Sequence, residues 1–291
     1  MNTPKKDQIY KGIIYACISF FMFTVQNAMA KLLLPFHDAI EVVFYRNLIC
    51  FVPCLIYVLV LRKYYLFKTS MPGTLFVRVF IGMIGTVLTI AASQYLPLSD
   101  ATVIFFMSTL LIPVLAHFYL KERIGLHRWL AVGIGMSGVI LVAQPSGDVT
   151  LFGISLALGA ACVHASIQVL IRAMKSENPF TITFYFFLMG LLGPALAMPW
   201  VANTLLIENI PILLGVGLSG GLGQYFLTRG FQMAPASLLG PFNYTGLIWA
   251  TGLDILIWHY VPGWPVFVGG AVIILSKFYI LYRERVTSEK K

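Results

Sequence analysis

Charged side chains inside long apolar segments are the first candidates for chemistry in this chain. Arg46 lies in the first half of the apolar segment Ile40 to Leu61, with Glu41 about one helical turn before it. A guanidinium can hold a carboxylate through two parallel hydrogen bonds. Arg46 therefore either pairs with Glu41 or Asp254 inside the protein or grips a carboxylate of a ligand.

Asp254 is the only carboxylate that lies well inside one of these segments. A carboxylate in apolar surroundings is costly to keep charged, so it is a candidate for exchanging protons or for binding a cationic ligand. The alternative is a salt bridge with Arg46 or with Lys31, which stands near the end of the first segment. Lys31, Glu41 and Asp254 are the candidate coupling or gating residues.

Neutral polar and aromatic side chains in the same segments can complete a binding site. His164 and Gln168 share one helical face, since they are four residues apart. These side chains can hydrogen-bond a polar ligand, or they can join helices to one another. Aromatic rings beside them can form walls for a planar or cationic ligand, although many of the 22 Phe must face lipid. The remaining candidate binding residues are Gln26, Asn27, Phe105, Gln224, Asn243, Tyr244 and Trp249.

Catalytic and cofactor motifs in a supporting context are missing from the sequence. It contains no His-Glu-x-x-His pattern, and its Gly-x-Ser-x-Gly run, Gly217 to Gly221, lies inside a glycine-rich apolar segment with no strand before it. Gly133 to Gly138 spells Gly-x-Gly-x-x-Gly, but the run lies inside an apolar segment with no strand before it. Cys50 and Cys54 are one helical turn apart, with no His or acid nearby in sequence to complete a metal site. We therefore expect neither an enzyme nor a cofactor.

Ten apolar segments must position these residues. The chain is 59% hydrophobic and only 11% charged, whereas soluble domains average about 25% charged residues. Most segments approach the ~20 residues that a helix needs to cross a bilayer, which predicts an all-α polytopic membrane protein. They run from Tyr10 to Leu34, Ile40 to Leu61, Gly73 to Tyr95, Ala101 to Leu120, Trp129 to Ala143, Phe152 to Ile171, Phe180 to Trp200, Ile210 to Phe231, Ser237 to Trp258 and Val266 to Tyr282.

Lys and Arg gather on one side of the predicted membrane. They precede the first segment and follow the even-numbered ones, as at Arg62, Lys63 and Lys68, whereas the turn Pro35 to Asp38 holds none. Such an asymmetry marks cytoplasmic loops, so both termini are expected in the cytoplasm. The net charge of +9 is explained by these loops, and nucleic-acid binding is not expected.

A short internal repeat divides the chain into two halves. Residues 94–99 and 232–237 both read Gln-x-x-Pro-x-Ser, and each lies between the third and fourth segments of its half. We therefore expect one five-helix repeat at 10–145 and a second at 150–285. Because five crossings are an odd number, the second half must be inverted. The first segment imitates a signal peptide, but its removal would leave four segments against five, so we expect it to be retained.

The arrangement resembles the drug/metabolite transporter superfamily, in its EamA-type branch with ten helices. The resemblance rests on Glu41 to Asn47, Tyr95 to Ala101 with Glu122-Arg123, Arg172 to Tyr185, and Ala234 to Thr245 with Trp249-Ala250 and Pro262. The nearest subgroup that we can name contains S-adenosylmethionine uptake transporters with amino-acid and vitamin carriers. One departure is Trp258-His259, where many relatives carry Gly-Glu.

The resemblance implies a secondary carrier of the bacterial inner membrane. It suggests a small polar metabolite, S-adenosylmethionine or an amino-acid-like solute, moved by alternating access, with protons or a counter-substrate as further partners. The protein would be a monomer or homodimer. The alternatives are an exporter of amino acids or toxic metabolites and, in another class, an intramembrane lipid-modifying enzyme or a membrane scaffold.

Overall fold

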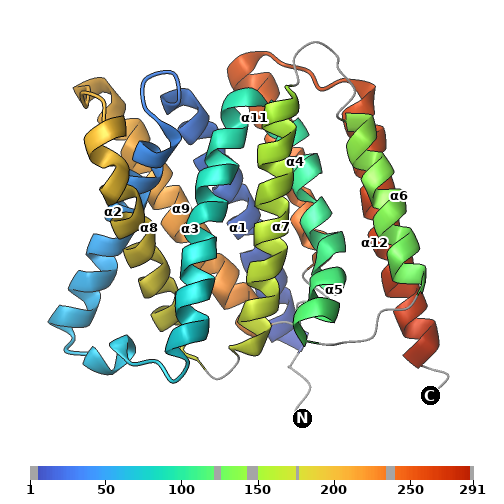
Figure 1. Cartoon of the computed structure of the whole chain (residues 1–291), viewed down its shortest axis with the longest axis horizontal. Helices are drawn as coiled ribbons and strands as arrows, with labels where there is room; N and C mark the ends of the chain where they lie inside the picture. The colour runs from blue at the N-terminus through green and yellow to red at the C-terminus, as the bar shows by residue number, and fades with distance from the viewer. Residues whose placement is uncertain (1–5, 121–125, 143–149, 175–176, 234–239, 289–291) are drawn as a thin grey trace.

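The structure, a computed structural model, describes residues 6–120, 126–142, 150–174, 177–233 and 240–288, and within them all regular structure is helical (Figure 1). The expected all-α fold is confirmed. The helices are α1 (Lys6–Leu33), α2 (Ala39–Val60), α3 (Pro72–Tyr95), α4 (Leu98–Phe105), α5 (Met107–Leu120), α6 (Leu126–Val142), α7 (Leu151–Ala173), α8 (Pro179–Val201), α9 (Ile210–Met233), α11 (Thr245–Trp258) and α12 (Trp264–Ser288), with 3-10 helices η1 (Tyr64–Phe67), η2 (Ile207–Asn209) and η3 (Gly240–Tyr244).

Most of these helices are apolar enough to lie in a membrane. Within the described residues, 5 stretches are also long enough to cross one: Tyr10–Leu33, Ala39–Val60, Pro72–Tyr95, Pro179–Val201 and Ile207–Leu227. Shorter apolar helices cover Leu98–Leu111, Trp129–Val142, Leu151–Ile167 and Trp264–Ser276. Helix α1 begins and α12 ends at the same end of the bundle, called the termini end below, as an even number of crossings requires (Figure 1).

Three pairs of corresponding helices in the two halves begin at the same offset. Helix α9 begins at Ile210, 138 residues after α3 begins at Pro72. The same interval separates the start of α5 from that of α11, and the start of α6 from that of α12. Helices α1 and α7 open the two halves and run in opposite directions (Figure 1). The ten-helix fold with two inverted halves is therefore confirmed.

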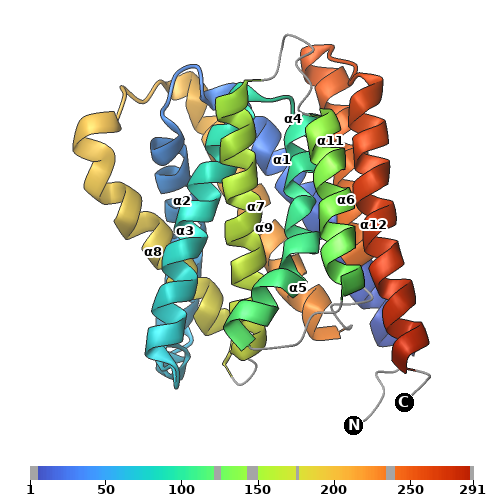
Figure 2. The same cartoon turned by 45° about the vertical axis from the view of Figure 1, so that its right-hand side comes forward.

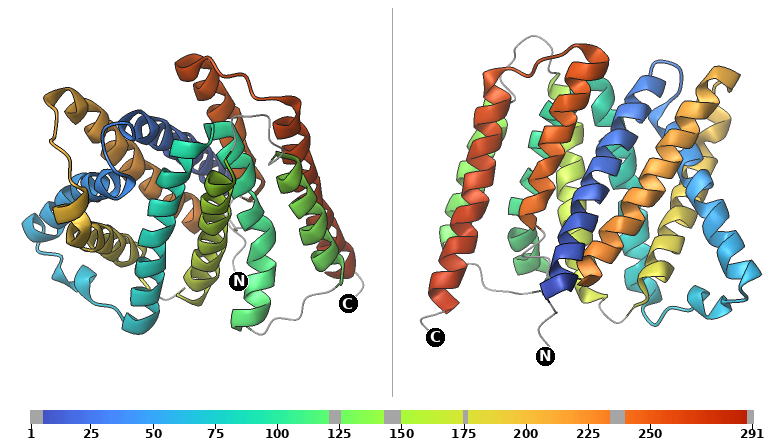
Figure 3. Two further views of the ribbon diagram at one scale, coloured as in Figure 1. Left: turned by 45° about the horizontal axis from the view of Figure 1, so that its top comes forward. Right: turned by 180° about the vertical axis from the view of Figure 1, so that it is seen from behind.

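Helices of opposite halves pack against each other throughout the bundle. Helix α1 lies along α9, α3 along α7 and α2 along α8, while α6 and α12 pair at one edge (Figures 2 and 3). At that edge a Cβ on Gly138 would stand 2.7 Å from the backbone oxygen of Gly269, so only glycine permits so close an approach. The interior is consequently an interface between the two repeats.

The fourth and ninth segments differ from their expected form. The fourth is not one helix from Ala101, because α4 already begins at Leu98 and is interrupted at Phe106 before α5. The ninth consists of η3 and α11, which meet at Tyr244, and residues 234–239, with part of the second Gln-x-x-Pro-x-Ser copy, lie outside the described residues. The interruptions at Phe106 and Tyr244 occupy the same position in the two repeats.

Candidate functional site

Arg46 is buried between three helices and is held by amide groups. Its side chain is 2% exposed. Its Nε donates to Gln26 Oε1 at 2.9 Å, and its Nη1 donates to Asn47 Oδ1 at 3.1 Å. Neither Glu41 nor Asp254, both within the described residues, lies at salt-bridge distance from Arg46. The internal ion pairs considered from the sequence are therefore not formed.

A glycine of the opposite half makes room for this cluster. A Cβ on Gly220 of α9 would stand 2.9 Å from Arg46 Nε. Because a larger residue would displace Arg46 or Gln26, Gly220 lets α9 lie directly over the pair. Asn27 joins the same cluster, since its Oδ1 accepts a hydrogen bond from Gln26 Nε2 at 3.3 Å. The structure therefore brings three of the candidate binding residues, Gln26, Asn27 and Arg46, into one cluster.

Arg78, on α3, is a second buried arginine that the sequence analysis missed. It is 4% exposed, and its Nε and Nη1 have no hydrogen-bond partner among the described residues. The guanidinium carbon lies 4.9 Å from the centre of the Phe186 ring, and that of Arg46 lies 5.6 Å from the same ring. The sequence did contain a signal for Arg78, because a charged residue at the sixth position of the apolar segment Gly73 to Tyr95 is a functional candidate.

His164 and Phe105 form a neighbouring contact on α7 and α4. Their rings lie 4.8 Å apart, and His164 also interacts electrostatically with Arg78. The two expected binding residues thus meet each other and lie near a cation. The side chain of Gln168 lies outside the described residues.

The remaining expected binding residues are spread over α9, η3 and α11. Tyr244 packs edge to face on Phe106 at 4.9 Å, and its hydroxyl lies 3.4 Å from Thr109 Oγ1. Trp249 is 39% exposed and packs on Phe21, so it lies toward the outside of the bundle. Gln224 and Asn243 are half-buried on α9 and η3. Of the two aromatic residues, Tyr244 packs inside the bundle and Trp249 lies at its outer surface.

Asp254 binds the beginning of α4 instead of a cation. Its carboxylate accepts hydrogen bonds from the backbone N–H groups of Leu98 (3.1 Å) and Ser99 (2.8 Å) and from the Ser99 hydroxyl (2.7 Å). These groups are the open donors of a helix start, where a negative charge is favoured. Lys31 donates to the backbone oxygen of Leu96 at 2.9 Å and interacts with Asp254 only over a longer distance. Asp254 thereby fastens the second half to α4 of the first.

Glu41 belongs to a separate network at the end of the bundle opposite the termini. Its Oε2 lies 3.0 Å from His37 Nδ1 and accepts a hydrogen bond from the backbone N–H of Asn203 at 3.3 Å. His37 Nε2 lies 2.9 Å from Asn209 Nδ2. The network ties the α1–α2 turn to the segment between α8 and α9. It places Glu41 away from Arg46.

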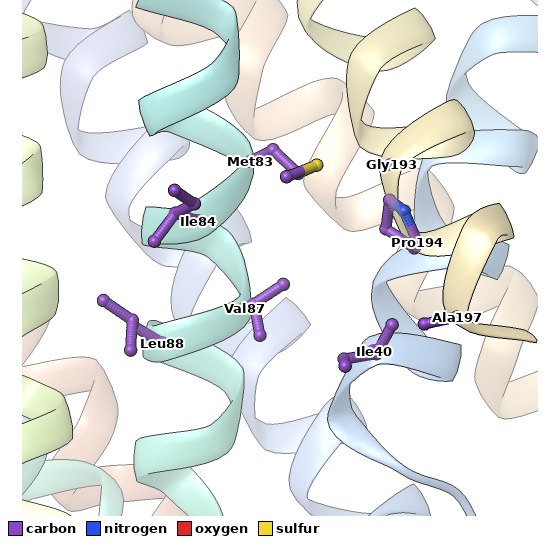
Figure 4. A pocket seen from close by; sticks show the side chains of 8 residues that line it. All are labelled: Ile40, Met83, Ile84, Val87, Leu88, Gly193, Pro194 and Ala197. Carbon is purple, nitrogen blue, oxygen red and sulfur yellow. The ribbon is translucent and has the colours of Figure 1, made fainter. Parts of the chain in front are cut away.

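An apolar cavity of about 190 Å³ opens between α2, α3 and α8. Figure 4 shows Met83 and Val87 of α3 facing Gly193, Pro194 and Ala197 of α8 across it. A cavity without polar groups can hold an apolar chain but cannot orient a polar solute. The polar candidates above are the better site.

Together, the fold and the site define a polytopic helical membrane protein with inverted repeats and buried polar groups between them. The EamA-like transporter family matches residues 10–144 and 151–282. The chain belongs to this family, and it is therefore a transporter and not an enzyme.

Named relatives carry different solutes. The pseudopaline exporter CntI of Pseudomonas aeruginosa is 26% identical over 93% of this chain and 95% of its own. The S-adenosylmethionine uptake transporter of Rickettsia bellii is 25% identical over 96% of each chain. The S-adenosylmethionine subgroup named from the sequence is therefore not favoured over other branches.

A solved structure supports the fold alone. One crystal structure superposes with a TM-score of 0.63 over 92% of this chain and 98% of that chain, at 15% sequence identity.

Proposed function

We propose that this protein is a secondary carrier that moves a small polar metabolite by alternating access. The two five-helix repeats, 10–145 and 150–285, would rock about the interior interface and open it to each side in turn. The setting would be a bacterial inner membrane, with both termini in the cytoplasm. The family membership supports the carrier, and the substrate and the orientation are our proposal.

One observation carries the position of the substrate site. Arg46, Gln26 and Asn27 cluster under Gly220 of the other repeat, so any rocking of the repeats must open or close the space beside them. Charged and polar groups buried within the membrane are energetically costly, so their presence there indicates a functional role. We assign substrate contact to this cluster and to Phe105, His164 and Tyr244, whose rings line the adjoining helices.

The direction of transport has two candidates. Uptake of S-adenosylmethionine or an amino-acid-like solute is suggested by the uptake transporter of Rickettsia bellii. Export is suggested by the exporter of Pseudomonas aeruginosa. An alternating-access carrier runs in either direction, because gradients and coupling set the net flux. Protons or a counter-substrate would supply that coupling.

The test uses the purified full-length protein. A panel of amino acids, S-adenosylmethionine and other small metabolites is screened for a rise in melting temperature, and stabilising solutes are then assayed for counterflow in proteoliposomes. The proposal expects at least one solute to stabilise reversibly and to exchange across the membrane. Binding without any exchange would refute it.

A further inference from the structure

We propose that Arg78 and Arg46 together form a site for an anionic group, so that the substrate class is a small carboxylate-bearing metabolite. The inference rests on the proposed carrier function, and it specifies the substrate that the carrier takes. It also adds Arg78 as a binding residue. The Arg78 side chain points into the protein, its Nε and Nη1 have no hydrogen-bond partner among the described residues, and it shares one aromatic ring with Arg46.

The Arg78 side chain points toward the middle of its helix. Its Nη1 lies 3.5 Å from the position of a Cβ on Gly82, one turn further along α3. Helical side chains normally lean the other way, toward the beginning of their helix. An arginine that only reached for water would extend toward the nearer end of α3, at Pro72. The observed direction is opposite, so the guanidinium is aimed into the protein.

Neither arginine has an acidic partner in the described part of the chain, since no carboxylate there lies within 4.0 Å of Arg46 or Arg78. Glu41 is engaged by His37 and Asn203, and Asp254 by the start of α4. The partners of Arg46 are neutral amides, which satisfy its N–H groups but not its charge. Two unpaired buried cations are unfavourable without a counter-charge, which a bound anion would supply.

Phe186 of α8 brings the two cations together. Its ring lies against both guanidinium groups, at 4.9 Å from Arg78 and 5.6 Å from Arg46. The arginines come from α2 and α3 of the first half, whereas the ring comes from the second half. Binding an anion between the arginines would therefore respond to movement of one repeat against the other. His164, which interacts electrostatically with Arg78, adds a polar group at the same place.

The chemistry favours a soluble carboxylate. Guanidinium forks match carboxylate and phosphate equally well, so a lipid headgroup has the same local chemistry. A headgroup, however, stays at the membrane surface, whereas the Arg78 donors are fully buried and directed toward the helix centre. We therefore commit to a carboxylate in solution, and the phosphate source becomes an arm of the test.

The first measurement compares melting temperatures of the purified protein without ligand. The variants are Arg78→Met, Arg46→Met and, as a matched loss of charge at an exposed position, Arg229→Met. Arg78→Met should melt at or above the wild-type temperature, because it removes a buried charge with unpaired donors. Arg46→Met should melt lower, because Gln26 Oε1 and Asn47 Oδ1 lose the donor that Arg46 supplies. A marked loss in Arg78→Met would show a structural arginine and overturn the inference.

The second measurement adds probes at millimolar concentration: succinate, glutamate, inorganic phosphate, choline, and vesicles containing phosphatidylglycerol. Succinate or glutamate should raise the melting temperature of wild type and of Arg229→Met, but not of Arg78→Met. Arg78→Lys keeps the charge without the fork and should weaken the effect roughly tenfold. Stabilisation by phosphate or lipid alone, or by choline alone, would overturn the assignment to a carboxylate.

Counterflow in proteoliposomes separates this inference from the carrier function. If only neutral or cationic solutes exchange, and Arg78→Met exchanges them as wild type does, the proposed anion site is refuted and the carrier function stands. Absence of exchange for every solute that binds would instead defeat the carrier. Exchange of a carboxylate that is lost in Arg78→Met and kept in Arg229→Met supports both.

Discussion

Phe106 and Tyr244 hold the same position in the two repeats, and their rings meet edge to face at 4.9 Å. Phe106 directly precedes α5, and Tyr244 directly precedes α11. The point where each repeat interrupts its fourth helix is therefore also a point where the repeats touch. Interrupted helices supply backbone groups and adjustable angles inside a membrane protein. Because the two rings are in contact, we expect a shift of the backbone at one interruption to move the other.

A double-mutant cycle measures this coupling. Phe106→Leu and Tyr244→Leu should each lower the stability of the empty protein, and together they should lower it less than the sum. The expected interaction is about 0.5–1.5 kcal/mol, the usual value for an aromatic pair. Unfolding in mixed micelles gives the four free energies. Full additivity would show that the ring contact does not link the repeats.

Asp254→Asn should destabilise the protein and not merely change its pH dependence. An amide offers one acceptor oxygen and places an NH₂ group against the N–H donors at Leu98 and Ser99. We expect a loss of about 1.5–3 kcal/mol, as for hydrogen bonds to a charged group, which revises the role in proton exchange considered from the sequence. Glu208→Gln is the exposed control. Full stability with impaired pH-driven transport would restore the proton-exchange role.

Gln26→Met should destabilise the empty protein through Arg46. The change removes the acceptor of the Arg46 Nε hydrogen bond and leaves a buried charged donor unpaired, at a cost of about 1–3 kcal/mol. In the background of Arg46→Met the same change should cost less, because the unpaired donor is gone. The melting temperature is the measurement, and Gln94→Met, at an exposed glutamine, is the control. Equal costs in both backgrounds would argue against the contact.

The protein should lose stability in acid when the Glu177 carboxylate becomes protonated. Its carboxylate accepts hydrogen bonds from the Ser70 hydroxyl and backbone N–H, and the hydroxyl is the main cause that lowers the pKa of Glu177 below its ordinary value of 4.5. A lowered folded-state pKa gives stability that is present above about 4.5 and is lost as the pH falls through the folded pKa. Wild type and Glu177→Gln should differ in melting temperature at pH 7 and converge at low pH. A constant difference would exclude this titration.

The proposed orientation is tested by labelling single cysteines in a background without the native four. Lys68→Cys and Thr204→Cys stand at exposed positions at opposite ends of the bundle. In sealed cells, an impermeant maleimide should modify Thr204→Cys directly and Lys68→Cys only after permeabilisation. The reverse pattern would invert the topology that the Lys and Arg distribution predicts.

The amino-acid sequence by itself determined the helices and their repetition. Apolar length is a local property, so segments such as Ile40 to Leu61 could be read directly and agree with α2. The Gln-x-x-Pro-x-Ser copies indicated the inverted halves for the same reason, since a repeat preserves local pattern. Arg46 and Gln26 could be singled out because few polar residues occur in the apolar segments, and they prove to be hydrogen-bonded to each other, while their role in binding stays a prediction.

Only the tertiary structure decided which partners these residues have. Asp254 contacts Ser99 across 155 positions, and Arg78 and Arg46 meet at one ring of α8. Such contacts depend on which helix faces pack together, and an apolar helix in a membrane carries no strong sequence periodicity to mark its buried face. Charge alone therefore left two readings of Arg46, a pair with Glu41 or Asp254 and a contact with a ligand carboxylate. Packing gave Glu41 to His37 and Asp254 to the start of α4, so that within the described part of the chain neither arginine has an acidic partner.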